Sequence, residues 1–374
     1  MKYRHYFLSD LVTIKYGKNQ KKVVSEYGNV PIYGTGGLMG YATDFLYDKP
    51  SVLIGRKGTI SKVKYVEQPF WTVDTLFYTV INTDLVIPKY LYYVMLQLDL
   101  NNYNEGTTIP SLRRETLYNL EFDIPPIDEQ KKVISCLKPL EEKIVNNNEI
   151  NNNLEQQIEM ILLKTINGTD TQLVKLGDYL YIKGRIGWKG LKKSEYLPIS
   201  NYRIINGESL TLSGIDWNKA GYISAERYED SPEIMLSIGD ILLSKDGTIG
   251  KIGYVDKLDV PTSVASGIFV IRNTRESEIS TQFIYYLLKS KLFKAFISSR
   301  TEGSVIPHLY QKDFMEFEFK LPSPDDMKAF DSITATMFSL VFSNLNENER
   351  LTHLRNSLLP KLMSGELDVS NIDI

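Results

Sequence analysis

The sequence "EGTTIPSL" (Glu105–Leu112) returns later in the chain as "EGSVIPHL" (Glu302–Leu309). Both copies place a glycine before a short polar or β-branched stretch that leads into Ile-Pro-x-Leu. Downstream, "FDIPPIDEQKK" (Phe122–Lys132) and "FKLPSPDDMKA" (Phe319–Ala329) match at the same offset. Self-similarity over such a distance predicts a chain built from repeated structural units.

The match extends upstream as well. "PSVLIGRKGTISKVKYV" (Pro50–Val66) parallels "GDILLSKDGTIGKIGYV" (Gly239–Val255), and "PKYLYYVML" (Pro88–Leu96) parallels "TQFIYYLLK" (Thr281–Lys289). The whole chain therefore contains two copies of one plan, each a mixed domain followed by a helix. The offset is smaller toward the front of each copy, which predicts extra residues in the second copy around Ile199–Asp230.

Length and composition agree with two soluble domains. A chain of 374 residues exceeds the size at which one hydrophobic core usually keeps growing. Its 43% hydrophobic and 24% charged residues are ordinary for a globular protein. The single cysteine, Cys136, excludes an intrachain disulfide and fits a reducing compartment. No apolar run approaches the roughly 18 residues of a membrane span, and no signal sequence is visible, so we expect a cytoplasmic protein.

The distribution of charge is more informative than the net charge of -3. Residues 1–65 carry eleven Lys and Arg against four acids, and Lys175–Lys193 has six bases against one acid. Glu121–Glu159 has nine acids and four lysines. Basic domains joined by acidic helices indicate that the domains face a polyanion. A chance fluctuation on a solvated surface explains the charges equally well.

Each copy ends in a helix with apolar residues at heptad spacing, which is typical of a helix that packs along a partner helix. The matching columns are Val133, Leu140, Asn147, Leu154 and Ile161 in the first copy, and Phe330, Met337, Asn344, Leu351 and Leu358 in the second. A central asparagine fixes register at some cost in stability. If the helices pack antiparallel, Asn147 and Asn344 should lie near each other. The alternative is a polar low-complexity stretch, Asn146–Gln157, without a seam.

The segments before the helices are rich in Tyr, Val and Ile in short runs broken by glycine, which predicts strands and tight turns. The turn "GRKGTI" projects Arg56, Lys57 and Thr59, and its counterpart "SKDGTI" projects Lys245, Asp246 and Thr248. Arg pairs with guanine, Lys with phosphate, and an acid accepts from cytosine. Different residues on the same turn suit two readers of different DNA sequences, although a solvated hairpin remains the alternative.

Other loops add polar and basic candidates. The glycines of "YGTGG" (Tyr33–Gly37) allow another backbone to approach closely. The segment "KGRIGWKGLKK" (Lys183–Lys193) interleaves an aromatic residue with bases, and Thr107 and Ser304 precede the Ile-Pro of the repeated sequence. The predicted DNA-binding residues are Lys18, Lys21, Thr35, Arg56, Lys57, Thr59, Thr107, Lys183, Arg185, Trp188, Lys189, Lys245, Asp246, Thr248 and Ser304.

Catalytic patterns are missing from the sequence. The three histidines are scattered, so no metal site is indicated, and no G-x-S-x-G nucleophile elbow is present. "PDDMK" (Pro324–Lys328) contains the letters of a nuclease cluster, but it reads as a helix start with acids in its first turn. We therefore predict a binding protein with no catalytic residue and no metal ligand.

Several segments of the sequence are similar to those of a known protein family. "PSVLIGRKGTI", "FWTVDTLFY", "IPPIDEQKKVI", "GWKGLKKSEY" and "LLPKLMSGEL" are similar to sequences of one family, and the chain resembles, over its whole length, the specificity subunit of type I restriction-modification systems. The second copy departs from the pattern in "LPSPDDMKAF", where Asp-Met replaces the usual Glu-Gln. This departure bears on how alike the two helix entries dock their partners.

The resemblance implies an α+β fold with an approximate twofold internal repeat. Two β-rich mixed target-recognition domains, 1–126 and 167–323, would be joined by two long spacer helices, 127–166 and 324–366, that form an antiparallel coiled coil before a C-terminal tail, 367–374. Each domain would read one half of a bipartite duplex site through the major groove, and the helices would set the gap.

The resemblance also implies partners. Two methylation subunits and two restriction subunits would join the chain, and S-adenosylmethionine, ATP and Mg would be bound by those partners and not by this chain. Two other functions stay open: a structural scaffold or protein-binding module of the same fold, and the specificity part of a fused modifier or cutter, which needs motifs absent here. Salt dependence separates a DNA reader from a scaffold, because phosphate contacts give affinity a steep dependence on salt.

Overall fold

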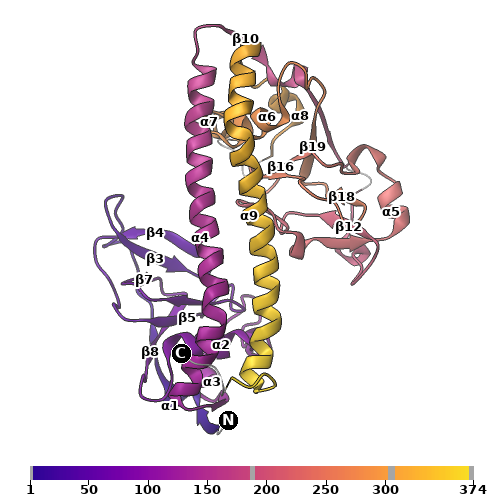
Figure 1. Ribbon diagram of the computed structural model, residues 1–374. Coiled ribbons are helices and arrows are strands. Elements are labelled where there is room, and N and C mark those ends of the chain that lie inside the picture. The colour runs from indigo at the N-terminus through magenta and orange to yellow at the C-terminus, as the bar shows by residue number, and fades with distance from the viewer. Residues whose placement is uncertain (1–2, 186–189, 302–307, 370–374) are drawn as a thin grey trace. The chain divides into compact units, whose positions relative to one another are not determined.

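The computed structural model describes residues 3–185, 190–301 and 308–369, and its chain divides into two compact units. The first unit comprises Met1–Asn146 and Glu347–Ile374, and the second comprises Asn147–Asn346. Two long helices, α4 (Ile127–Ile166) and α9 (Pro324–Ser364), each contribute one half to each unit (Figure 1). The predicted series of domain, helix, domain and helix therefore maps onto two units that share both helices.

The first unit is built on three antiparallel or mixed sheets. Their strand orders are β1 (Arg4–Phe7) with β9 (Glu121–Ile124); β2 (Val12–Tyr16), β8 (Leu76–Ile81), β5 (Ser51–Gly55), β6 (Val63–Val66); and β4 (Gly37–Ala42), β3 (Val30–Gly34), β7 (Trp71–Thr72). The helices are α1 (Leu8–Leu11), α2 (Pro88–Leu96) and α3 (Arg114–Tyr118), with a 3-10 turn η1 (Leu100–Tyr103).

The second unit repeats these sheets in the same order. They are β10 (Thr171–Lys175) with β20 (Glu318–Pro322); β11 (Leu180–Gly184), β19 (Ile268–Asn273), β16 (Ile241–Ser244), β17 (Ile252–Tyr254); and β15 (Gly221–Ile223), β12 (Tyr202–Ile205), β18 (Thr262–Val264). The helices are α5 (Ala225–Glu229), α6 (Thr281–Lys289), α7 (Lys291–Thr301) and α8 (Gln311–Met315), with 3-10 turns η2 (Leu176–Tyr179), η4 (Lys193–Glu195), η5 (Trp217–Lys219) and η6 (Pro232–Ile234). The predicted internal repeat is confirmed.

One additional hairpin distinguishes the second unit. Strands β13 (Leu210–Thr211) and β14 (Gly214–Ile215) lie between β12 and β15, where the first unit has only the tight turn between β3 and β4. This position lies within Ile199–Asp230, the stretch in which the sequence predicts extra residues.

The four-stranded sheet of each unit lies between two apolar cores. In β5, Val52 and Ile54 belong to the core that also holds α2, whereas Leu53 belongs to a smaller core on the opposite face. In β16, Leu242 likewise points away from Ile241 and Leu243. Successive side chains of a strand point to opposite faces, so a strand covered on both faces must be apolar at every position. This explains the uninterrupted apolar runs in both copies.

The long helices pack antiparallel within each unit. In the first unit, Leu137 near the start of α4 shares a core with Leu359 near the end of α9. In the second unit, Leu162 near the end of α4 shares a core with Phe330 near the start of α9. Each such buried side chain contributes about 1.5–3 kcal/mol. Each domain is therefore stabilised by the start of one long helix and the end of the other.

A glutamine docks α4 to the first domain. Gln130 is fully buried, and its amide oxygen accepts from the backbone N–H of Ile87 at 2.7 Å. Its amide nitrogen donates to the carbonyl oxygens of Leu85 and Pro125, each at 2.9 Å. Two of these hydrogen bonds thus join the first turn of α4 to the segment that leads into α2, and the third binds the carbonyl of Pro125 just before α4.

The second unit achieves this docking with other residues. The position of Gln130 in the repeat is taken by Met327, which is buried in the apolar core. Instead, the hydroxyl of Ser280 donates to Asp331, and the side-chain amide of Gln282 donates to Thr334. The two helix starts therefore dock onto their own domains by different contacts.

Buried asparagines lie at the centre of the helix pair, and the hydrogen bond of Asn344 is made to Asn151, one turn from the Asn147 named by the sequence. The amide of Asn344 donates to the side-chain oxygen of Asn151 at 2.8 Å, and Asn151 donates to the carbonyl of Val341 at 3.1 Å. Asn151 lies one helical turn beyond Asn147, which is also buried. In an antiparallel pair the two heptad positions of one helix face the opposite positions of the other, so Asn344 meets the second heptad position of α4, which contains Asn151.

Removing either member of this amide pair should destabilise the second unit. Asn151→Leu or Asn344→Leu leaves a buried amide without its partner, which costs about 1–3 kcal/mol. The double variant should lose less than the sum, with a coupling of about 1–2 kcal/mol in guanidinium unfolding. Asn153→Leu, on the exposed face of α4, is the control. Additive single effects would contradict the pairing.

The first copy of the repeated sequence forms a closed loop. The N–H of Glu105 donates to the carbonyl of Ser111 at 2.9 Å. The side-chain oxygen of Asn104 accepts from the N–H groups of Gly106 and Ser111, each at 2.9 Å. A Cβ on Gly106 would lie 1.9 Å from the carbonyl oxygen of Ile109. Glycine is required here because the loop folds back on its own backbone.

Gly106→Ala should therefore destabilise the first unit by about 1–3 kcal/mol, since the loop must open to accept a methyl group. Gly36→Ala is the matched control, because a Cβ there meets nothing within 4 Å. Chemical unfolding of both variants tests the closed loop. Equal stability of the two variants would show that the loop is not closed as described.

Candidate nucleic-acid interface

The turn between β5 and β6 presents two exposed polar side chains and one braced arginine. The guanidinium of Arg56 donates to the carbonyl of Asp74 at 3.0 Å and lies 5.1 Å from the ring centre of Tyr16. Lys57 and Thr59 are exposed. Gly58 between them has a φ of 89°, a conformation that favours glycine. The turn therefore holds Arg56 against the domain and leaves Lys57 and Thr59 accessible.

The repeated sequence packs against this turn. The N–H of Leu112 donates to the carbonyl of Arg56 at 2.9 Å, and the N–H of Gly58 donates to the carbonyl of Pro110 at 2.8 Å. Lys57 and Ser111 face each other in an antiparallel bridge. The exposed loop that carries Thr107 thus continues the surface of the turn.

The second unit makes the same connection. The N–H of Leu309 donates to the carbonyl of Lys245 at 2.9 Å. Asp246 and His308 face each other in an antiparallel bridge, and the carboxylate of Asp246 contacts Nδ1 of His308. The ammonium of Lys245 lies 4.9 Å from the ring centre of Phe269. The sequence Ile-Pro-x-Leu is repeated because its leucine makes the same backbone hydrogen bond to the same turn in each domain.

A third loop completes the surface in the first unit. Thr35 of the glycine turn lies close to Gly58, because a Cβ on Gly58 would be 3.7 Å from the Thr35 hydroxyl oxygen. A cavity of about 180 Å³ beside this turn is lined in part by Lys62 and Lys64. The ammonium of Lys64 lies 4.0 Å from the ring centre of Tyr33, and burial lowers the pKa of Lys64.

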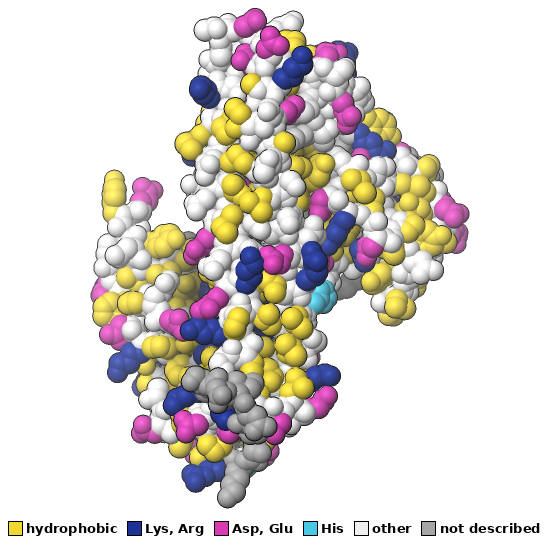
Figure 2. Space-filling model, in the orientation of Figure 1, with side chains coloured by type: hydrophobic (Ala, Val, Ile, Leu, Met, Phe, Trp, Pro, Cys, Tyr) yellow, Lys and Arg dark blue, Asp and Glu magenta, His cyan; other side chains and the backbone are white. Residues whose placement is uncertain are grey.

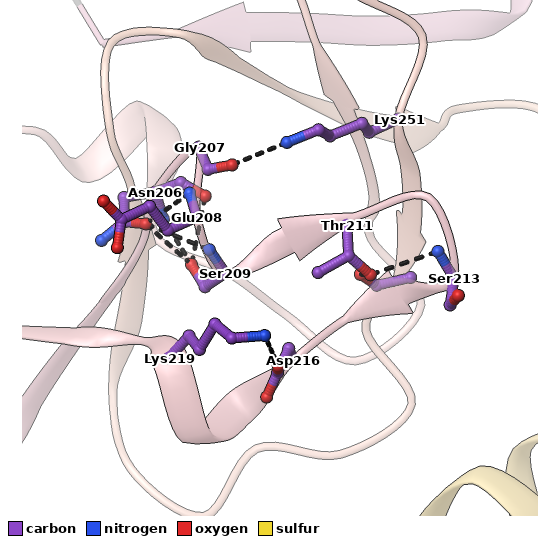
Figure 3. Close-up of polar contacts among 10 residues, drawn as sticks. Asn206, Gly207, Glu208, Ser209, Thr211, Ser213, Asp216, Lys219 and Lys251 are labelled. Carbon is purple, nitrogen blue, oxygen red and sulfur yellow. Dashed lines mark hydrogen bonds and ion pairs between the residues drawn. The ribbon is translucent and has the colours of Figure 1, made fainter. Parts of the chain in front are cut away.

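In the second unit the excursion Asn206–Ala220 takes the place of this glycine turn (Figure 3). The ammonium of Lys251, which lies just before β17, donates to the carbonyl of Gly207 at 2.7 Å. The excursion also rests on β17, because a Cβ on Gly253 would lie 2.7 Å from the side chain of Ile215. It is therefore anchored at the base of the turn that carries Asp246.

The excursion is held by its own short-range hydrogen bonds, as Figure 3 shows. The side-chain oxygen of Asn206 accepts from the N–H of Glu208 at 2.8 Å, and the hydroxyl of Thr211 accepts from the N–H of Ser213 at 3.1 Å. These contacts hold a tip on which Leu212 is 78% exposed. The second unit thus carries an apolar side chain on an excursion that the first unit lacks.

Apart from Arg185, the predicted residues fall into three groups. Described side chains that are exposed are those of Lys18, Lys21, Lys57, Thr59, Thr107, Lys183, Asp246 and Thr248. Half-buried ones, each part of a loop described above, are those of Thr35, Arg56 and Lys245. Trp188, Lys189 and Ser304 lie outside the described residues.

Arg185 occupies a position that the sequence did not predict. It is 2% exposed and donates to the carbonyl of Val264 at 3.2 Å and to the hydroxyls of Ser231 and Ser263. Burial lowers its pKa. β11 ends at Gly184, so the alternation that keeps Lys183 outside does not continue to Arg185. Arg185 braces the interior of the second unit and is withdrawn from the candidate contacts.

Sequence reasoning also missed residues. Ser111 and His308 occupy the variable position of Ile-Pro-x-Leu, and the one visible signal was that this position differs between two otherwise similar sequences.

On the face drawn in Figure 2, Lys and Arg side chains are interspersed with Asp and Glu, so that face is not a continuous basic surface. Among the described residues, no group of three or more His, Cys, Asp or Glu side chains is placed to hold a metal ion. None of the described helices is long and apolar enough to cross a membrane.

Comparison with known proteins agrees with this geometry. The type I restriction enzyme MjaVIII specificity subunit of Methanocaldococcus jannaschii is 22% identical over 352 residues, which cover 86% of this chain and 77% of that protein. The HindI specificity subunit of Haemophilus influenzae is 20% identical and covers 76% of this chain and 79% of its own. The crystal structure of a type I restriction-modification S subunit from M. genitalium has the same fold, with a TM-score of 0.54, 19% identity, and coverage of 97% of this chain and 96% of that chain.

The family model described as the type I restriction modification DNA specificity domain matches the chain twice, over residues 2–156 and 169–352. These two ranges correspond to the two copies that the repeated sequence defines, and together they cover most of the chain. With two DNA specificity domains and an internal repeat, the chain belongs to the family of type I restriction-modification specificity subunits.

Proposed function

We propose that each unit of this chain reads one half of a bipartite duplex DNA site through the major groove. One observation carries the proposal: the same backbone hydrogen bond presents different side chains in the two units. In the first unit the bridge positions hold Lys57 and Ser111, and in the second they hold Asp246 and His308. A constant frame with variable side chains is what two readers of different half-sites require.

The chemistry of these side chains supports direct readout. Lys57 is a donor that suits guanine O6 and N7 or a phosphate, whereas Asp246 is an acceptor that suits the amino group of cytosine or adenine. Exposed Lys18 and Lys21 in the first unit, and Lys183 in the second, supply phosphate contacts that position each unit without specifying bases. The two half-sites should therefore differ in sequence.

The long helices suit a spacer. We propose that α4 and α9 set the number of unread base pairs between the half-sites and bind two methylation subunits, with two restriction subunits joining the complex. The chain itself would be non-catalytic and cytoplasmic. It would bind no cofactor, and S-adenosylmethionine, ATP and Mg would be held by the partner subunits, which would methylate adenine or cut unmethylated DNA. The family assignment supports this division of labour.

The first test compares the methylomes of a strain with this gene and the same strain without it. A split motif with N6-methyladenine in each half, lost on deletion, is expected. Binding of the purified chain to duplex DNA should also fall steeply with salt, because phosphate contacts release counterions. Absence of both a gene-dependent motif and duplex binding would favour a scaffold.

Lys57→Ala should relax or abolish recognition of one half-site and leave the other unchanged, because Lys57 lies on the turn of only one unit. Loss of one good base contact should reduce discrimination at that position about tenfold or more. Asp246→Ala, at the equivalent position of the second unit, is the reciprocal variant and should affect the other half. The readout is the methylated motif. A change in both halves from either variant would show that the units do not read independently.

Removing one heptad from both α4 and α9 should shorten the gap and leave the bases unchanged. Seven helical residues span about 10.5 Å at 1.5 Å each, which corresponds to about three base pairs at 3.4 Å. Sequencing of the methylated motif measures the gap. Removal from one helix alone is the control, because it disrupts the pairing instead of shortening it. An unchanged gap after the double removal would exclude the spacer role.

A further inference from the structure

The variable position of the repeated sequence lies opposite a residue of the turn between β5 and β6 in the first unit, and of the turn between β16 and β17 in the second. In the first unit Ser111 faces Lys57, and in the second His308 faces Asp246. The following leucine fixes this register, because its N–H donates to the turn at 2.9 Å in each unit. The turn residue and the residue at the variable position therefore form an equivalent pair in the two units, and both members differ.

The second pair is linked side chain to side chain. The carboxylate oxygen Oδ1 of Asp246 contacts Nδ1 of His308. The carboxylate side chain is 44% exposed and the imidazole 34% exposed, so both remain accessible from the surface. The contact uses one carboxylate oxygen, and the other is available to accept a hydrogen bond from a ligand.

Neighbouring groups restrict how the pair can move. The ring of Tyr310 packs edge-on against the imidazole, with ring centres 4.6 Å apart. Gly267 lies beneath the carboxylate, where a Cβ would be 3.5 Å from the Cβ of Asp246. The ammonium of Lys245 lies over Phe269, and that of Lys312 lies 5.9 Å from the Tyr310 ring centre. Aromatic packing and a close backbone therefore hold the imidazole and carboxylate in one arrangement.

We propose that His308 is a positioning residue that orients the carboxylate of Asp246 to read one exocyclic amino group in the second half-site. This inference rests on the proposed DNA-reading function. An acceptor-only carboxylate matches the amino group of adenine or cytosine in the major groove and rejects the carbonyls of guanine and thymine. The DNA phosphates repel a carboxylate, and a hydrogen-bond donor beside it stabilises its charged form and fixes its direction. His308 supplies that donor.

The test uses the methylome of a strain in which this gene is replaced by variants. The wild-type chain should prefer one base pair at one position of the second half-site by about ten- to hundredfold. His308→Ala should reduce this preference to near unity. Asp246→Asn should affect the same base pair. Ser111→Ala, at the equivalent position of the first unit, should leave the second half-site unchanged.

Conservative replacement separates positioning from mere folding. In His308→Asn the amide nitrogen can occupy the place of Nδ1 and donate to Asp246, so the wild-type motif should return. In addition, His308→Ala combined with Asp246→Asn should be no worse than Asp246→Asn alone, because both changes remove one function. Continued methylation of the first half-site adenine in each variant shows that the subunit is folded and assembled.

Three results would overturn the inference. The first is an unchanged motif in His308→Ala; the second is relaxation at different base pairs in the His308 and Asp246 variants; the third is equal loss in His308→Ala and His308→Asn. If His308→Ala abolishes methylation altogether, the purified variant is tested against duplexes with single base-pair changes, and retained discrimination at the expected position would also reject the inference. Absence of any motif with the wild-type gene would instead reject the proposed function.

Discussion

A single backbone hydrogen bond, from the leucine N–H of Ile-Pro-x-Leu to the carbonyl of the turn after the central strand, organises each unit. It joins Leu112 to Arg56 in the first unit and Leu309 to Lys245 in the second. The bond brings a loop from the end of the domain to a turn from its middle, and so creates one surface from distant parts of the sequence. Because it uses only backbone atoms, the side chains around it are free to differ. This separation of frame from side chains allows one fold to present two chemically different surfaces.

The sheets, turns and helices around this hydrogen bond also combine a constant backbone with variable side chains. The inner strands β5 and β16 are buried on both faces, so they must be largely apolar and leave little room for variation. Variation is concentrated at turns, where Lys57 and Asp246 replace one another, and in the excursion Asn206–Ala220, which substitutes for a short glycine turn. Helix docking varies as well, since Gln130 in one unit is replaced in function by Ser280 and Asp331 in the other. At the helix docking sites the position of the hydrogen bond is kept, whereas the side chains that form it differ between the two units.

Repetition made much of the fold predictable from the sequence. Two copies, two long helices and a buried asparagine in each helix follow from spacing alone, because heptad and strand periodicities reflect which side chains are buried. The residue that pairs with Asn344 across the two long helices could not be predicted from the sequence spacing. The partner of Asn344 is Asn151 and not Asn147, since a heptad column does not reveal which column faces it across an antiparallel pair. Arg185 is buried because its strand ends one residue earlier, and strand ends are set by tertiary contacts. His308 was overlooked because its role arises only when the loop meets the turn.

The division of the long helices between the units has a consequence for biosynthesis. The second unit is one continuous stretch, Asn147–Asn346, whereas the first needs both Met1–Asn146 and Glu347–Ile374. As the chain leaves the ribosome, the N-terminal domain emerges first, yet its core lacks Leu359, Leu362 and Val369 until the end of α9 and the residues just after it have been made. The domain that is made first is therefore the last to be completed. A nascent chain that stops within α9 can contain a complete second unit and an incomplete first one, so completion of the first unit requires the end of α9.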